Sequence, residues 1–87
     1  MFSLYILLCA DNSLYTGIAK DLNERLEVHR SGKGSKYVKS RKPFKLIYTE
    51  GFTTWSDALK REIEIKKWSR VEKIQKLKLN VEDFLSS

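Results

Sequence analysis

The chain carries at residues 4–18 the stretch LYILLCADNSLYTGI, in which an unbroken apolar run meets a short polar turn and then an alternating segment. The run from Leu4 to Cys9 has the length of a β-strand and is too uniformly apolar for a surface helix. It therefore predicts a central strand. Residues 14–18 alternate in side-chain character, which predicts a second strand that pairs with the first as a hairpin.

The length of the turn decides which side chains of the hairpin share a face. If the loop consists of residues 10–12, with Asn12 in the left-handed conformation, Tyr5 pairs with Gly17 across the hairpin. Tyr5 and Tyr15 then lie on one face, and Gly17 leaves room beside the Tyr5 ring for a ligand. A turn one residue shorter would separate the two tyrosines. We favour the three-residue loop, with packing in a small aromatic core as the alternative role of either tyrosine.

Three pairs of residues at helix-capping spacing mark where helices begin: Asp21 with Glu24, Thr54 with Asp57, and Ser69 with Glu72. They predict a first helix that ends at a Gly32 C-cap, a second that runs to about residue 68, and a third through Leu77. Residues 44–51 predict a third strand, and the tail from Asn80 could add one more helical turn. The order ββαβαα predicts an α+β fold, in which helices cover a small three-stranded antiparallel sheet.

Length and composition limit the class of protein. The 87 residues suffice for one domain and rule out two, and 41% hydrophobic with 32% charged residues is typical of a soluble globular protein. One cysteine and one histidine exclude a disulfide framework and a metal site built from Cys and His. The apolar start has no Lys or Arg before it and is too short to span a bilayer, so we expect a cytoplasmic protein without a membrane partner. A monomer is favoured.

Positive charge gathers in one segment of a chain whose formal net charge is +6. Between Glu27 and Glu50 there is no acid, but there are seven cations: Arg30, Lys33, Lys36, Lys39, Arg41, Lys42 and Lys45. Because the rest of the chain is close to neutral, the sequence predicts a one-sided positive surface that contacts a nucleic-acid backbone. Tyr37, between the cations, is the candidate for stacking on a base. A solvated loop is the alternative, and attachment to anionic lipid is disfavoured because no helix has a wide apolar face flanked by lysines.

Two of the predicted helices carry polar residues on faces that should be buried. Leu22, Arg25, Leu26 and His29 share one face of the first helix, and desolvating a guanidinium and an imidazole is costly unless an anion meets them. That face is expected to border a cleft. The alternative is that the aliphatic part of Arg25 packs at the edge of the core while its guanidinium stays in water. In the second helix, Glu62 sits among apolar neighbours. Glu62 either forms an ion pair with Arg25 or holds a divalent cation, and the sequence spacing does not distinguish these two roles.

These residues, in this order, resemble the GIY-YIG nuclease domain family: Tyr5 in Ser3-Leu4-Tyr5, Tyr15 in Tyr15-Thr16-Gly17, then Arg25, His29 and Glu62. The family's first motif is Gly-Ile-Tyr-like and its second Tyr-Ile-Gly-like, so Ser3 replaces the first glycine. Residues 31–37 and the short length resemble the small stand-alone bacterial branch. The resemblance covers residues 3–77 and leaves 78–87 as the C-terminal tail of a single domain, 1–87.

The resemblance implies a metal-dependent endonuclease that hydrolyses phosphodiester bonds and serves DNA repair or processing, with DNA favoured over RNA as the substrate. The sequence shows no base-reading motif, which favours selection of structure rather than sequence. It implies that Tyr15 helps to activate water, that Arg25 steadies the phosphate, and that Glu62 binds one divalent cation, Mg²⁺ or Mn²⁺. Tyr5 and His29 would support the nucleophile or relay protons. A free tyrosine has a pKa of about 10, so Tyr15 needs a nearby cation to act as a base at neutral pH. A non-catalytic nucleic-acid-binding module with the same fold is the alternative.

Overall fold

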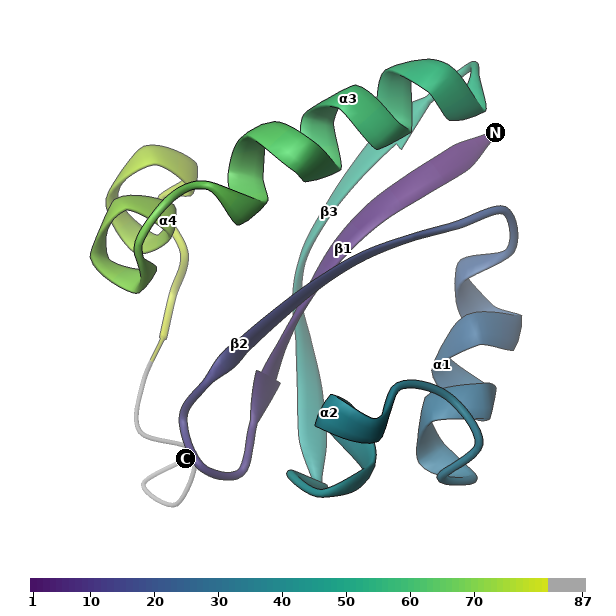
Figure 1. The fold of residues 1–87 in the computed structure, drawn as a ribbon, viewed down its shortest axis with the longest axis vertical. Coiled ribbons are helices and arrows are strands. Elements are labelled where there is room, and N and C mark those ends of the chain that lie inside the picture. The colour runs from purple at the N-terminus through teal and green to yellow at the C-terminus, as the bar shows by residue number, and fades with distance from the viewer. Residues whose placement is uncertain (82–87) are drawn as a thin grey trace.

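The fold is built on a three-stranded antiparallel sheet with the strand order β2-β1-β3, so that β1 is central as predicted. The computed structural model describes residues 1–81. Its elements are β1 (Phe2–Cys9), β2 (Leu14–Ala19), α1 (Leu22–Arg30), α2 (Lys36–Lys39), β3 (Phe44–Phe52), α3 (Trp55–Lys66) and α4 (Arg70–Leu77), shown in Figure 1. The predicted α+β class and the order ββαβαα are confirmed. The helix α2 is a single turn inside the cation-rich residues 30–45, here called the basic segment.

The β1–β2 hairpin has the register that the three-residue loop predicts. Tyr5 pairs with Gly17, and Asn12 adopts a φ of 66° in the turn. A Cβ atom at position 17 would lie 2.6 Å from the Tyr5 hydroxyl, so glycine is needed for the Tyr5 ring to lie over this strand. Because Tyr5 and Tyr15 both point to the same face, the hairpin alone brings the two phenols together.

Helices cover both faces of the sheet, which explains why the side chains of residues 4–9 are all buried. The helices α1 and α2 lie on one side of it and α3 with α4 on the other (Figure 1). The α1–α2 side buries Tyr5, Leu7, Ala19, Leu26 and Val38. The α3–α4 side buries Leu4, Ile6, Ile65 and Leu79. An apolar run without polar alternation is therefore the pattern of a strand covered twice.

The third strand departs from the regular alternation of its sequence. The register with β1 shifts between Ile6 and Leu7, so that a β-bulge interrupts the pairing. As a result the consecutive residues Ile47 and Tyr48 both pack against the α3–α4 side, whereas Phe44 packs against the α1–α2 side. Without the extra residue, Tyr48 would share the face of Phe44.

The helix ends follow the predicted capping residues. Asp21 and Thr54 accept hydrogen bonds from the backbone of α1 and α3. Ser69 and Glu72 form a reciprocal capping box at the start of α4. The helix α3 ends at Lys66, about two residues before the predicted end.

Two further predictions concern the chain ends and membranes. Residues 80 and 81 are not helical, and the remainder of the predicted final turn lies outside the described residues. Within residues 1–81 no helix combines the length and the apolar character that crossing a membrane requires.

Candidate active site

A buried tyrosine and a buried histidine form the centre of the candidate site. The Tyr5 hydroxyl lies 2.8 Å from His29 Nε2, and each residue is only 2% exposed. The central strand supplies Tyr5, and the last turn of α1 brings His29 over the sheet. Secondary structure on two sides therefore fixes the pair before any ligand binds.

Tyr15 completes an aromatic triad with this pair. Its ring centroid lies 6.3 Å from that of Tyr5 and 5.5 Å from that of His29. Unlike the other two side chains, Tyr15 is only half-buried, because β2 is an edge strand of the sheet. Tyr15 is thus the member of the triad that can meet a water molecule or a substrate.

The environment of Tyr5 keeps its phenol protonated. Burial, and then the neighbouring Tyr15, raise the pKa of Tyr5 well above its usual value of 10. The negative charge of Glu62 acts in the same direction, whereas the positive charge of Arg25 opposes it. A phenol in this state can donate and accept hydrogen bonds, but it does not serve as a free base at neutral pH.

His29 is held in its neutral form. Burial first, and then the charge of Arg25, lower the pKa of the imidazole from its usual 6.5. Its Nδ1 atom is buried and has no hydrogen-bond partner within residues 1–81. A Cβ atom at Gly34 would lie 2.7 Å from this Nδ1, so the backbone of the basic segment closes directly over the ring. Sequence reasoning missed Gly34, although its place in the segment of residues 31–37 was a usable signal.

Arg25 borders an open hollow, whereas Leu22, Leu26 and His29, the other residues of the face that was expected to border a cleft, do not line it. Its side chain is exposed and lines a hollow of about 280 Å³ together with Asp21 and Glu24. Within residues 1–81, Arg25 forms no ion pair, and its charge acts on both Tyr5 and His29. Tyr15 and Glu62 do not line this hollow. The guanidinium is therefore available to an anion that approaches the triad from the α1 side.

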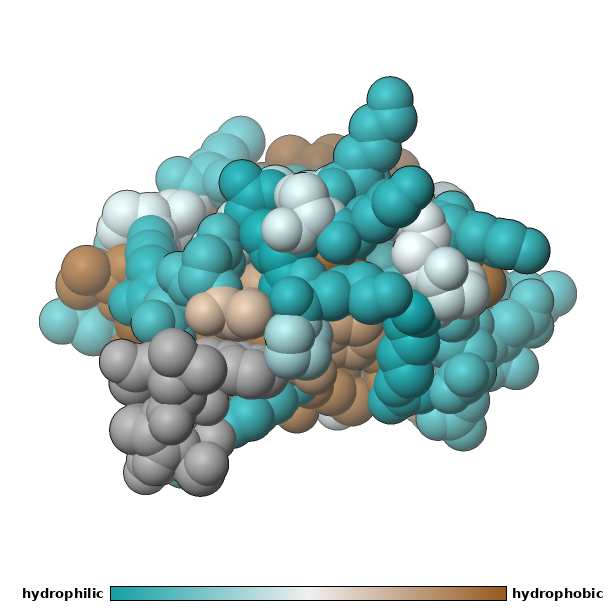
Figure 2. Space-filling view, turned by 90° about the horizontal axis from the view of Figure 1, so that it is seen from below, coloured by the Kyte–Doolittle hydropathy of each residue, from teal (hydrophilic) through white to brown (hydrophobic). Residues whose placement is uncertain are grey.

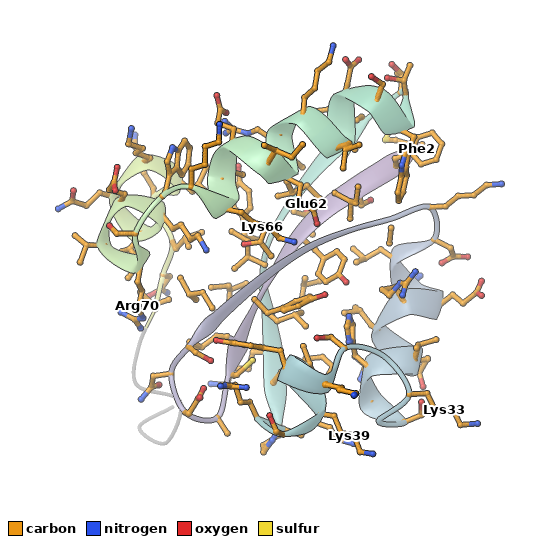
Figure 3. The ribbon with its side chains drawn as sticks, in the orientation of Figure 1. Phe2, Lys33, Lys39, Glu62, Lys66 and Arg70 are labelled. Carbon is orange, nitrogen blue, oxygen red and sulfur yellow. The ribbon has the colours of Figure 1, made fainter. Side chains whose placement is uncertain are left out.

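Glu62 approaches Tyr5 from α3, on the other side of the sheet. Figure 3 shows that Glu62 and Lys66 project from α3 toward β2. The carboxylate of Glu62 lies 3.2 Å from the ammonium of Lys66, and its side chain is 14% exposed. The alternative pairing with Arg25, which the sequence left open, does not occur. Tyr15, Arg25, His29 and Glu62 thus all act on one phenol, that of Tyr5.

The donor set around Glu62 limits which cation could bind. No group of three His, Cys, Asp or Glu side chains that could hold a metal ion occurs within residues 1–81. A structural zinc or a fully caged calcium site therefore does not fit. Mg²⁺ keeps several water ligands and is commonly held by one or two carboxylates together with substrate phosphates, so the number of carboxylates that Glu62 supplies fits this ion. The carboxylate is 14% exposed and would have to exchange the Lys66 ammonium for the ion.

The basic segment divides into structural and exposed cations. Arg41 lies 2.9 Å from Asp11 in an ion pair, Arg30 pairs with Glu27, and Lys42 donates to the backbone carbonyl of Arg30. Lys45 is half-buried in β3. The predicted contacts that remain exposed and form neither an ion pair nor a side-chain hydrogen bond within the described part of the chain are Lys33, Lys36 and Lys39.

The exposed cations lie on the face formed by the end of α1 and by α2. Lys33 and Lys39 project away from the core here (Figure 3). Figure 2, seen from below, shows a surface made largely of hydrophilic side chains, with apolar atoms in the gaps between them and at the edges of the view. This face carries the predicted nucleic-acid contacts.

Tyr37 has a packing role that the sequence did not predict. Its ring centroid lies 5.9 Å from that of Tyr15, and the Arg41 guanidinium lies 3.8 Å above the Tyr37 ring. The proposed stacking of a nucleobase on Tyr37 would have to displace Arg41. In this arrangement the Tyr37 ring packs against Tyr15, and Arg41 packs on the Tyr37 ring.

Comparison with known proteins finds a family model that matches most of this chain and relatives that match it over most of their length. Residues 1–76 match the GIY-YIG catalytic domain. A UPF0213 protein from Staphylococcus epidermidis is 54% identical over 72 residues, which cover 83% of this chain and 88% of that protein. A UPF0213 protein from Staphylococcus aureus is 52% identical over 75 residues, covering 86% of this chain and 92% of that protein.

Two solved structures share the fold. The solution NMR structure of a UPF0213 protein from Bacillus halodurans matches with a TM-score of 0.60 and 42% identity, covering 90% of this chain and 84% of that one. The solution NMR structure of an E. faecalis protein matches with a TM-score of 0.63 and 44% identity, covering 87% of this chain and 81% of that one. Both matches support the sheet and helix order described above.

Proposed function

Because the chain belongs to the GIY-YIG catalytic domain family, which implies a nuclease-type activity on nucleic acid, we propose that it is a divalent-metal-dependent endonuclease acting on DNA. It would select the structure of the DNA rather than its sequence, in repair or processing. The observation that carries this proposal is the arrangement around Tyr5, where Tyr15, Arg25, His29 and Glu62 arrive from three elements on both sides of the sheet.

The aromatic triad offers a path for the proton of the attacking water. Tyr15 would accept this proton while its own proton moves to the oxygen of Tyr5. The Tyr5 proton would move in turn to Nε2 of the neutral His29, which is 2.8 Å away. Tyr15 can then act as a base without first losing its own proton, which answers the difficulty posed by a tyrosine pKa of about 10.

Arg25, and a cation held by Glu62, would stabilise the negative charge of the phosphate. The guanidinium of Arg25, which no acid within residues 1–81 neutralises, can donate two parallel hydrogen bonds to the phosphate oxygens. Glu62 would hold the divalent cation. Such a cation supplies charge stabilisation for the phosphate and for the leaving oxygen.

The exposed lysines of the basic segment would hold the DNA beside the site. Lys33, Lys36 and Lys39 are suited to phosphate contacts, which position a nucleic acid without reading its bases. The sequence offers no motif for reading base edges, which favours recognition of DNA shape.

A cleavage assay tests the proposal. We expect the purified protein to cut at least one member of a panel of duplex, single-stranded and branched DNA in Mg²⁺ or Mn²⁺, and to stop in EDTA. RNA of matched structure tests the preference for DNA. Cleavage that is unaffected by EDTA, or that Glu62→Gln leaves at the wild-type rate, would contradict the metal-dependent mechanism.

A nucleic-acid-binding module without catalysis is the second candidate function. The ion pair between Glu62 and Lys66 favours it, because the ammonium already occupies the carboxylate that a metal ion would need. Salt-dependent DNA binding that survives Glu62→Gln, without metal-dependent cutting of any member of the panel, would support this candidate over the enzyme.

A further inference from the structure

The chain holds a second group of cations that its overall charge balance conceals. Residues 66–78 contain six cations and one acid, Glu72: the cations are Lys66, Lys67, Arg70, Lys73, Lys76 and Lys78. Acids elsewhere, at residues 11–27, 50–64 and 82–83, cancel this excess in the sum over the chain. The one-sided positive surface predicted from the sequence is therefore only part of the charge distribution.

One of these cations contacts the candidate site, a second contacts the β1–β2 turn, and a third shares a helix face with the second. Lys66 reaches Glu62 at 3.2 Å. Arg70 and Lys73 are three residues apart on α4 and so share one face of that helix. The Arg70 guanidinium donates to the backbone carbonyl of Asn12 at 3.1 Å, so this face lies against the turn that leads into β2.

Within residues 1–81, no acid pairs with the Lys73 ammonium. Lys73 is half-buried. Burial, followed by the positive charge of Lys66, lowers its pKa. Two like charges held near each other repel, and an anion bound between them would remove this cost.

The position of these cations complements that of the basic segment. The basic segment reaches the site through Tyr37, which contacts Tyr15, and through Gly34, which covers His29. Lys66 reaches the site from the other side, through Glu62. Figure 3 shows Lys66 and Arg70 along α3 and α4, well separated from Lys33 and Lys39 at the opposite end of the molecule.

We propose that Lys66, Arg70 and Lys73 form a second DNA-backbone contact, here called the α4 surface, across the candidate site from Lys33, Lys36 and Lys39. This inference rests on the proposed function and deepens it. A strand held on both sides of the scissile phosphate extends past the site in both directions. The substrate would thus be cut at an internal bond rather than released from an end.

The salt dependence of DNA binding tests the α4 surface. Fluorescence anisotropy with a labelled duplex, in EDTA to prevent cleavage, gives the affinity at several salt concentrations. Each lost phosphate contact makes the slope of log affinity against log salt shallower by about 0.9. We expect the double variant Lys66→Gln/Lys73→Gln to lose about two units of slope and to bind at least roughly tenfold more weakly at low salt.

A matched control separates this contact from the loss of any two charges. Lys60 and Lys67 are both exposed and lie seven residues apart on the outward face of α3, away from the buried Ala58 and Ile65. The double variant Lys60→Gln/Lys67→Gln should keep the wild-type slope. Because half-buried Lys73 contributes to packing, thermal unfolding is measured for each variant. The single variant Lys66→Gln, at an exposed side chain, should still lose about one unit of slope.

The outcomes distinguish the inference from the proposed function. If neither Lys66→Gln nor the double variant changes the slope more than the control does, while Lys33→Gln/Lys36→Gln/Lys39→Gln weakens binding, the α4 surface is overturned and the proposed function stands. If the wild-type protein shows no salt-dependent binding to DNA, both are overturned. A selective loss with Lys66→Gln supports the inference.

Discussion

Glycine at two positions makes room for the central pair of the candidate site. The Tyr5 ring lies over Gly17, and His29 lies under Gly34; a Cβ atom would fall 2.6 Å from the Tyr5 hydroxyl and 2.7 Å from His29 Nδ1 respectively. The side chains that such a Cβ atom would meet, Tyr5 and His29, are buried and hydrogen-bonded to each other, so they have little freedom to move. Both positions thus tie local backbone packing directly to the chemistry of the site.

Substituting Gly34 tests the packing over His29. We expect Gly34→Ala to displace the imidazole, break its hydrogen bond with Tyr5, and destabilise the fold by about 1–3 kcal/mol, as overpacking of a core does. Thermal unfolding and the NMR signals of the His29 ring measure both effects. At Gly51 a Cβ atom would meet only the flexible Met1 side chain, so Gly51→Ala is the control and should be nearly neutral. Equal effects of the two substitutions would contradict this role of Gly34.

The buried state of His29 predicts how stability depends on pH. Because burial and Arg25 lower its pKa from 6.5, the unfolded chain binds a proton at His29 at a higher pH than the folded protein does. Stability should therefore decrease as the pH falls below about 6.5. Urea denaturation at several pH values measures this loss, and His29→Gln should remove it over the same range. If the free energy of unfolding of His29→Gln falls as steeply with decreasing pH as that of the wild-type protein, groups other than His29 cause the loss.

At the scale of elements, the one-turn helix α2 connects the basic segment to the β1–β2 hairpin. Arg41 follows α2 and binds Asp11 in the β1–β2 turn, while its guanidinium covers Tyr37. Tyr37 in turn contacts the Tyr15 ring. This chain of contacts fixes the position of Tyr15 on an edge strand that has no neighbour on its outer side within residues 1–81.

Tyr37 is therefore expected to affect the rate of cleavage more than the binding of DNA. Replacing it by leucine keeps an apolar side chain but removes the ring beside Tyr15, which should lower the single-turnover rate about tenfold through misplacement of Tyr15. Lys39→Gln, on the same helix, should weaken binding and leave this rate unchanged. Cleavage and anisotropy measured on both variants check the contrast. A Tyr37→Leu variant that binds weakly but cuts at the normal rate would favour direct contact with DNA.

Local signals account for the part of the fold that the sequence predicted. Asp21, Thr54 and Ser69 cap helices through bonds to residues nearby in the chain. Asn12 sets the hairpin register in the same local way. The β3 bulge and the support of Tyr15 by Tyr37 depend on contacts between distant segments, so neither could be derived from spacing. The ion pair of Glu62 with Lys66, by contrast, is a local contact one turn along α3, which the spacing offered and sequence reasoning missed. The placement of Glu62 beside Tyr5 depends on how α3 crosses the sheet, and spacing could not give it.

Over the whole molecule, the candidate site draws on both layers that cover the sheet. Arg25 and His29 come from the α1 side, and Glu62 comes from the α3 side, while Tyr5 and Tyr15 lie on the strands between them. Cations are concentrated in two segments of the chain, residues 30–45 and 66–78, and Lys66 of the second segment contacts Glu62. The proposed activity thus requires the entire fold, since neither layer alone carries a full set of groups.

The single-turnover rate of DNA cleavage, measured with excess protein and Mg²⁺, tests most directly whether Tyr15, Arg25 and Glu62 act in one reaction. We expect Tyr15→Phe, Arg25→Ala and Glu62→Gln each to lower the rate by about 100-fold or more, and the double variants to lose far less than the product of the single losses. Lys60→Gln, on the outward face of α3, is the control and should cut like the wild-type protein. Wild-type rates for all three single variants would contradict the account.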